Sequence, residues 1–143
     1  LVGSEMCIRD RRYADGLREA VRARGLNDAI VFAGHRTDMR EIYAVSTLLL
    51  SLSAKPESFG RTVLEALSLG RPVVGYDQGG VGEVLRRMYP AGLAPVGDPD
   101  RLTDRVAEVL RDAPPVSSEQ PYPLQRMLDQ TLALYQGVSQ APR

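Results

Sequence analysis

Two glutamates near a glycine-containing loop are the residues in this sequence whose types and spacing best suit chemistry. Glu57 lies in the irregular segment 53–60, and Glu65 follows with seven residues between them, in a segment with helical periodicity. Carboxylates accept hydrogen bonds from the vicinal hydroxyls of sugars and ribose, and the free amides at a helix start favour an anion such as a diphosphate. On spacing alone the simpler interpretation is favoured, in which Glu57 complements the helix dipole and Glu65 is a solvated helix charge.

The elements that must position these carboxylates alternate between apolar runs and amphipathic segments. Short apolar runs predict buried strands, and apolar residues at helical spacing predict the helices between them. The expected strands are 29–33, 48–52, 72–76 and 93–96, and the expected helices are 13–24, 38–43, 61–69, 81–87, 98–112 and 124–136. This alternation is typical of βαβ units and predicts an α/β fold, with a parallel sheet of four to five strands and helices on both faces.

Three loops follow predicted strands and are therefore the places where a ligand is expected, because such sheets bind ligands beyond the carboxyl ends of their strands. They are 34–37, 53–60 and 77–80. In the last of these, Gly79 and Gly80 could bring their amides to a phosphate or could simply turn the chain, and the sequence does not decide between the two.

Length and composition exclude several classes of protein. The chain has 143 residues, of which 43% are hydrophobic, with 18 basic and 18 acidic side chains. This suits a single domain and gives no case for a disordered chain, a membrane-spanning helix or a nucleic-acid partner. Cys7 is the only cysteine and His35 the only histidine, which excludes a disulfide framework and a zinc site rich in histidine or thiolate. The Asp98-Pro99-Asp100 run is expected to cap a helix rather than to bind a metal, so we expect neither a metal nor a cofactor.

The whole chain, 1–143, is interpreted as one domain. Residues 1–11 fit no regular period and resemble translated sequencing adapter, and residues 4–11 are expected to be poorly packed. The Pro- and Ser-rich segment 114–123 is expected to be a linker to the final helix, 124–136, which we expect to pack back on the body. Because the chain starts at Leu1 without a signal-peptide pattern, we expect it to be a fragment.

One long run of residues resembles a known family. It comprises residues 55–74, KPESFGRTVLEALSLGRPVV, followed by GGVGE at 79–83. Its Pro-Glu-x-Phe-Gly lead-in, Glu-x7-Glu pair and Gly-x-Pro-Val strand entry resemble glycosyltransferase family four, the retaining, nucleotide-sugar-dependent enzymes of the GT-B fold. The looser match covers residues 13–83. The resemblance implies that the chain is the C-terminal, Rossmann-like, nucleotide-sugar-binding half of that fold.

The resemblance also implies a role for each matching residue. Glu57 would be the catalytic-site glutamate that binds hydroxyls of the donor sugar, and Glu65 would bind the ribose hydroxyls. The remaining residues implied at the site are donor-side Ser58, Phe59, Gly60, Thr62 and Val63, base-side Gly34, His35 and Arg36, and the phosphate-side turn at Gly79 and Gly80.

The resemblance implies as well what this chain lacks. The family's basic diphosphate clamp and its N-terminal acceptor domain would lie outside it, so the isolated chain is expected to transfer no sugar. Its partners would be a nucleotide-sugar, an acceptor that is a glycan, lipid or small molecule, and the missing domain. The expected location is cytoplasmic, with membrane association only through that domain. Two other hypotheses are a nucleotide-sugar epimerase of similar fold and a non-catalytic nucleotide-binding module; the upstream coding sequence would distinguish them.

Overall fold

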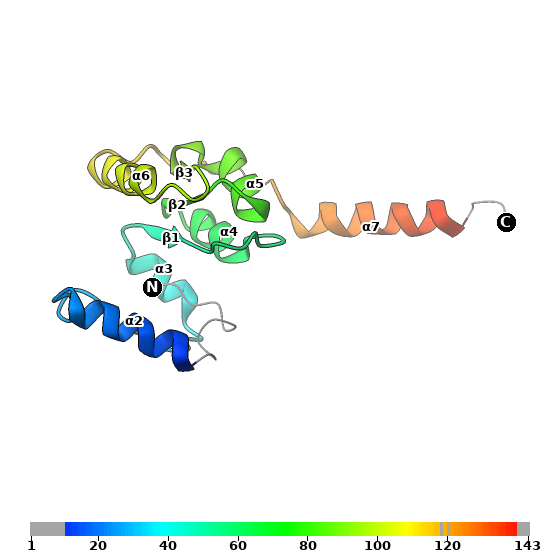
Figure 1. Ribbon diagram of the computed structural model, residues 1–143. Coiled ribbons are helices and arrows are strands. Elements are labelled where there is room, and N and C mark those ends of the chain that lie inside the picture. The colour runs from blue at the N-terminus through cyan, green and yellow to red at the C-terminus, as the bar shows by residue number, and fades with distance from the viewer. Residues whose placement is uncertain (1–10, 118, 120, 140–143) are drawn as a thin grey trace.

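The computed structural model describes residues 11–117, 119 and 121–139, which form helices around a short sheet (Figure 1). Residues 1–10, including Cys7 and most of the segment expected to be poorly packed, lie outside this description. The helices are α2 (Arg11–Ala23), α3 (Met39–Val45), α4 (Arg61–Ser68), α5 (Gly79–Met88), α6 (Pro99–Arg111) and α7 (Leu124–Ser139), with the 3-10 turn η1 (Pro90–Gly92). The strands are β1 (Leu49–Ser51), β2 (Val73–Tyr76) and β3 (Leu93–Ala94).

The three strands form one parallel sheet in the order β1-β2-β3, in which Leu49 pairs with Val73 and Gly75 with Leu93. Helix α4 connects β1 to β2, and α5 connects β2 to β3. Figure 1 shows the strands between α6 on one side and α4 with α5 on the other. The α/β class and the parallel arrangement predicted from the sequence are therefore confirmed, with three strands in the described part of the chain instead of four to five.

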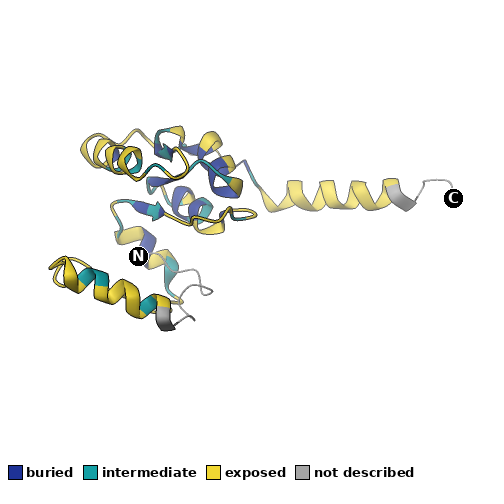
Figure 2. Cartoon of the chain, viewed as in Figure 1, coloured by how far each residue is buried: buried dark blue, intermediate teal, exposed yellow. Residues whose placement is uncertain are grey.

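The core lies where the sheet meets α4, α5 and α6, as the dark blue segments of Figure 2 show. Val74 in the central strand is fully buried and Leu49 in β1 is nearly so, as predicted. Helix α4 contributes Val63 and Leu67 to this core and α6 contributes Val109. Apolar burial of this kind stabilises the body that carries the loops at the carboxyl ends of β1 and β2.

The predicted strand at 29–33 is wrong: these residues form a turn and an irregular segment with no strand pairing. Val31, expected to be buried, is 80% exposed, and the apolar face of α2 is also largely uncovered at Tyr13 and Leu17. An apolar run predicts that a segment tends to be buried, but a strand also requires a neighbouring backbone to take its hydrogen bonds. In the described structure β1 pairs with β2 alone, and 29–33 does not join the edge that β1 leaves open.

The last helix also differs from the prediction. Helix α7 forms where expected, but it extends away from the body instead of packing back on it (Figure 1). Its apolar side chains are exposed, among them Leu128, Leu132 and Tyr135. Helical periodicity predicted the apolar stripe correctly, but the stripe does not specify the surface that covers it. None of the helices in the described ranges combines the length and hydropathy needed to cross a bilayer.

Two helix starts correct the sequence analysis in detail. Asp38, the first residue of the expected helix 38–43, instead precedes α3, and its side chain makes no capping hydrogen bond but pairs with Arg36. Helix α5 begins at Gly79, two residues earlier than expected, so the two glycines open a helix and do not merely turn the chain. At α6 the expected cap is confirmed, because the Asp98 carboxylate accepts a hydrogen bond from the Arg101 amide at 2.9 Å.

Candidate functional site

The loop after β1 and the start of α5 are bound to each other at the carboxyl edge of the sheet. The Gly80 amide donates a hydrogen bond to the Glu57 carbonyl at 2.8 Å. The side-chain amide of Gln78 donates to the Ser53 carbonyl, also at 2.8 Å. These two bonds bring together the second and third of the ligand loops that the sequence predicted, and they hold the backbone of Glu57 against α5.

Two glycines make this close contact possible. A Cβ on Gly80 would lie 2.3 Å from the backbone of Phe59, so a side chain there would push the loop away from α5. Gly60, the residue before α4, has φ +71°, a left-handed conformation that glycine adopts without strain. The sequence left open whether the Gly80 amide contacts a phosphate or the glycine only turns the chain. In the structure this amide is already bonded to the Glu57 carbonyl, so Gly80 serves the packing of the loop against α5.

Glu65 is held by two other side chains. One carboxylate oxygen pairs with Arg61 Nε at 2.7 Å, and the other accepts a hydrogen bond from the Tyr43 hydroxyl at 3.3 Å. Tyr43 belongs to α3 and is only 2% exposed. Its burial, followed by the negative charge of Glu65, raises the pKa of the Tyr43 phenol, so the phenol keeps its proton and remains a donor to Glu65.

Glu57 has a different environment. Its side chain is half-buried, and within the described structure its carboxylate has neither a hydrogen bond nor an ion pair. It lines a cavity of about 10 Å³ together with Ser53, Lys55 and Gln78. That volume holds about one water molecule, so a larger ligand must bind at the mouth of the crevice or separate its walls.

The backbone amides that are expected to bind the donor differ in whether they already donate a hydrogen bond. The Val63 amide donates to the Gly60 carbonyl at 3.1 Å, within the first turn of α4. Thr62 precedes it, in the part of a helix whose amides have no intrahelical acceptor. Ser58 and Phe59 are exposed in the loop, whereas Gly60 is buried. The start of α4 is thus open to an anion mainly through the residues before Val63.

The base-side loop 34–36 lies before α3 and is exposed. Its Gly34 has φ +67°. The Arg36 guanidinium forms a two-point ion pair with Asp38, which holds the pKa of the Asp38 carboxyl below its usual value. Arg36 is therefore committed to its own loop, and the structure does not bring it to Glu57 or Glu65.

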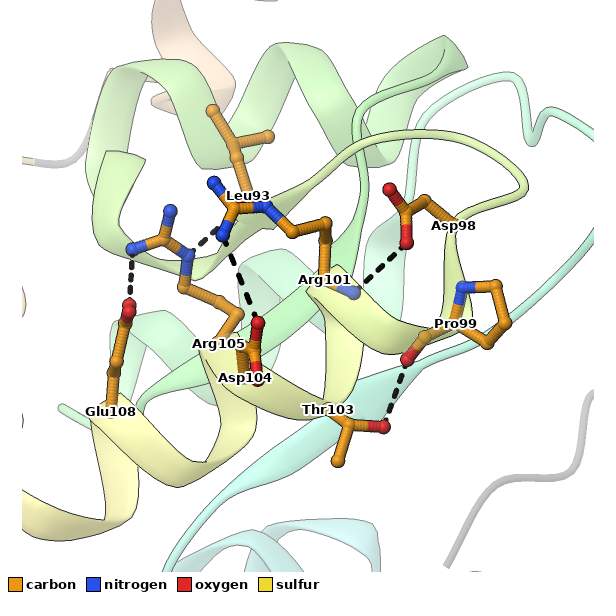
Figure 3. A network of polar contacts seen from close by, with 8 residues as sticks. All are labelled: Leu93, Asp98, Pro99, Arg101, Thr103, Asp104, Arg105 and Glu108. Carbon is orange, nitrogen blue, oxygen red and sulfur yellow. Dashed lines mark hydrogen bonds and ion pairs between the residues drawn. The ribbon is translucent and has the colours of Figure 1, made fainter.

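A larger cavity of about 320 Å³ lies beside β3 and α6, and neither Glu57 nor Glu65 lines it. Figure 3 shows polar contacts among side chains of this region. Its charged side chains are already paired. Arg105 contacts Glu108 at 2.7 Å and the Leu93 carbonyl at 3.2 Å, Arg101 faces Asp104 at 3.7 Å, and Asp77 pairs with Arg86 at 2.7 Å. The charged side chains of this cavity thus already have partners, whereas the Glu57 carboxylate has none in the described structure. Within the described ranges, no cluster of three or more His, Cys, Asp or Glu side chains could hold a metal.

Three residues that hold the two glutamates or their loops in place were not singled out from the sequence. Tyr43 fixes Glu65, and Gln78 and Ser53 tie the two loops together. Ser53 and Gln78 lie in the two loops that follow predicted strands, so the predicted topology could have identified them. Tyr43 carried no comparable signal, because an aromatic residue on a helix face most often indicates core packing.

Comparisons with known proteins bear on this site. The family model described as "Glycosyl transferases group 1" matches residues 2–112. An N-acetyl-alpha-D-glucosaminyl L-malate synthase from Bacillus anthracis is 37% identical over 87 residues, which are 61% of this chain and 23% of the relative. A 2-deoxystreptamine N-acetyl-D-glucosaminyltransferase from Streptomyces fradiae is 34% identical over 108 residues, 74% of this chain and 25% of the relative. The chain thus spans about a quarter of these relatives.

Solved structures show the same similarity in three dimensions. The crystal structure of Anabaena Alr3699/HepE in complex with UDP and glucose matches with a TM-score of 0.67 and 28% identity, over 72% of this chain and 28% of that one. The same protein in complex with UDP-glucose matches equally well. This chain therefore shares the fold of part of that protein over 72% of its own length.

Proposed function

The chain belongs to the glycosyl transferases group 1 family, and from that premise we propose that it is the donor-binding, C-terminal half of a retaining glycosyltransferase of family four. The complete enzyme, meaning this chain together with an acceptor-binding domain, would transfer a sugar from a nucleotide-sugar to a glycan, lipid or small-molecule acceptor. The chain spans about a quarter of its relatives, so the whole reaction is assigned to the complete enzyme.

One observation carries this proposal: the bond between Gly80 and Glu57 holds the Glu57 loop against the start of α5, and this loop leads directly into α4, the helix that bears Glu65. This arrangement presents two carboxylates and the start of α4 at the carboxyl edge of a parallel sheet, where α/β folds bind nucleotides. Carboxylates suit the hydroxyls of sugar and ribose, and the start of α4 suits the diphosphate between them. A nucleotide-sugar has these three groups in that order.

The roles we propose follow from this fit. Glu57 accepts hydrogen bonds from the donor-sugar hydroxyls, and its charge stabilises the positive charge that develops at the anomeric carbon as the bond to the diphosphate breaks. Glu65 binds the ribose hydroxyls. The amides of Ser58 and Phe59 approach the sugar, and the amide of Thr62 approaches the diphosphate. Gly34, His35 and Arg36 form the base side. That the reaction uses no metal remains a prediction.

The donor we propose to test first is UDP-glucose, because UDP and UDP-glucose are bound by the structurally similar HepE. Titration of this chain with UDP, UDP-glucose and inorganic pyrophosphate, followed by amide NMR or calorimetry, tests the site. We expect weak saturable binding of UDP and UDP-glucose, and weaker binding of pyrophosphate, which lacks the ribose. Equal binding of all three would reduce the site to a general anion site, and no binding of either nucleotide would refute the proposal.

The same preparation distinguishes the alternative reactions. We expect the isolated chain neither to transfer glucose nor to convert UDP-glucose into an epimer, because acceptor groups and the basic clamp are expected outside it. Formation of the epimer would favour a nucleotide-sugar epimerase. Measurable transfer would show that this chain contains a complete active site.

A further inference from the structure

The ring of Phe59 contacts an aromatic residue from a distant part of the chain. Phe59 lies in the loop that carries Glu57, and its ring meets that of Tyr122 edge-on, with the centroids 5.6 Å apart and the planes at 79°. This is the geometry that aromatic pairs prefer, because the positive edge of one ring faces the negative face of the other. Tyr122 belongs to the segment between α6 and α7, which the sequence suggested was only a linker.

Tyr122 is itself anchored to the body. The Arg87 guanidinium on α5 lies over the Tyr122 ring, 5.9 Å from its centroid. The preceding Pro121 is buried, and Val116 and Tyr122 both pack against the main hydrophobic core. The segment therefore presents the Tyr122 ring to the loop from a fixed position.

The Glu57 loop needs such a support on its outer side. Its inner side is held by the Gly80 and Gln78 hydrogen bonds, but the loop has no regular secondary structure between β1 and α4. The Phe59 side chain remains 46% exposed even with Tyr122 against it. Without the Tyr122 ring, this apolar side chain would be more exposed to water, and only the Gly80 and Gln78 hydrogen bonds would hold the loop against α5.

From these contacts we propose that Tyr122 is a positioning residue for the donor-sugar loop: it holds Phe59, and through Phe59 it fixes Glu57 and Ser58 against the donor. This role rests on the proposed function of the crevice. Glu65, by contrast, lies on α4 and is fixed by Arg61 and Tyr43, neither of which makes a hydrogen bond or a ring contact with Tyr122 in the described structure. Loss of the Tyr122 ring should therefore weaken recognition of the sugar and leave recognition of the nucleotide nearly unchanged.

The test compares Tyr122→Ala with Tyr122→Phe, which keeps the ring. Tyr135→Ala, a change of an exposed tyrosine on α7, is the matched control. In the 143-residue chain, we expect Tyr122→Ala to weaken UDP-glucose binding by roughly two- to ten-fold, the range for loss of one aromatic pair, with UDP binding changed less than two-fold. We also expect faster hydrogen exchange at the amides of Ser58, Phe59 and Gly60. Tyr122→Phe and Tyr135→Ala should match the unsubstituted chain in both measurements.

The two readouts separate the possible failures. If the unsubstituted chain binds both nucleotides and Tyr122→Ala changes neither the UDP-glucose to UDP affinity ratio nor the loop exchange, the positioning role is wrong. Equal weakening for both nucleotides, or faster exchange throughout the core, would indicate general destabilisation and would also overturn it. If the unsubstituted chain binds neither nucleotide, the proposed function fails and the role in donor recognition fails with it, whereas the exchange data still show whether Tyr122 restrains the loop.

Discussion

Glu57 and Glu65 belong to one loop-helix unit, yet the structure treats them in opposite ways. Both oxygens of Glu65 are bound, one by Arg61 on its own helix and one by a phenol from α3. At Glu57 only the backbone carbonyl is bonded, to the Gly80 amide. Its carboxylate has no hydrogen bond or ion pair among the described residues. One carboxylate is thus fixed before any ligand arrives, and the other has its hydrogen-bonding capacity uncommitted.

This difference indicates how one glutamate can serve ligand binding while the other serves the chemical step. A preorganised group such as Glu65 binds a ligand with little further ordering, which suits contacts that stay constant through a reaction. An uncommitted group such as Glu57 can form its strongest contacts when charge develops at the reacting carbon. The predictions below test this division.

The largest effect is expected for Glu57→Gln in the complete enzyme. The change keeps the shape of the side chain and removes its negative charge, so it should lower kcat by roughly ten-fold to a thousand-fold, with a smaller effect on the donor KM. Steady-state kinetics with varied donor checks this. A variant with unchanged kcat would show that Glu57 takes no part in the reaction.

Gly80→Ala should damage the crevice through its backbone. The new Cβ would overlap the Phe59 backbone at 2.3 Å, so the loop must move and lose the Gly80–Glu57 bond. We expect a loss of about 1–3 kcal/mol in the free energy of unfolding, as for other overpacked sites, measured by denaturant titration. Gly16→Ala is the control, because no atom lies near its added Cβ. Equal stability of the two variants would contradict the close packing of these loops.

Glu65→Gln should affect binding more than turnover. Ribose lies away from the reacting carbon, so we expect the donor KM of the complete enzyme to rise by roughly three- to ten-fold while kcat stays within about two-fold. Glu108→Gln is the matched control, because it too removes a glutamate paired with an arginine one helical turn away. A fall in kcat that exceeds the rise in KM would reverse the roles assigned to the two glutamates.

The smallest effect is expected for Tyr43→Phe. The ring stays in the core and only the hydroxyl bonded to Glu65 is lost, so UDP affinity of the chain should fall by roughly two- to five-fold, the equivalent of one weak hydrogen bond. Tyr89→Phe provides the comparison. Tyr89 is also 2% exposed, but its buried hydroxyl has no hydrogen-bond partner in the described structure. If the two variants bind UDP equally well, the Tyr43 hydroxyl does not orient Glu65.

The sequence predicted the packed half of the molecule well, because its periodicity reports burial directly. The runs around Leu49 and Val74 and the stripe containing Val63 all lie in the core. Prediction failed where the outcome depends on a partner: among the described residues, the segment at 29–33 pairs with no strand and the apolar face of α7 is exposed. Periodicity indicates which face of an element is apolar and tends to be buried, but it carries no information about the element that packs against that face.

The candidate site shows the same limit. Strand ends and the Glu-x7-Glu spacing placed both glutamates at one edge of the sheet. The contacts that set them apart depend on tertiary structure: Tyr43 comes from a different helix, Tyr122 from the segment expected to be a linker, and Gly80 acts through its lack of a side chain. Such contacts join residues far apart in the sequence, which local patterns do not relate.

The most direct test of the central claim is to measure the affinities of Glu57→Gln and Glu65→Gln for UDP and UDP-glucose, in this chain and side by side with the unsubstituted form. If Glu65 binds ribose and Glu57 binds the sugar, Glu65→Gln weakens both ligands by the same factor, and Glu57→Gln weakens UDP-glucose alone. Thermal unfolding of both variants should stay near that of the unsubstituted chain, because neither side chain is fully buried. Unchanged affinities in both variants, or equal weakening of UDP and UDP-glucose by Glu57→Gln, would contradict the division of the crevice into a sugar side and a ribose side.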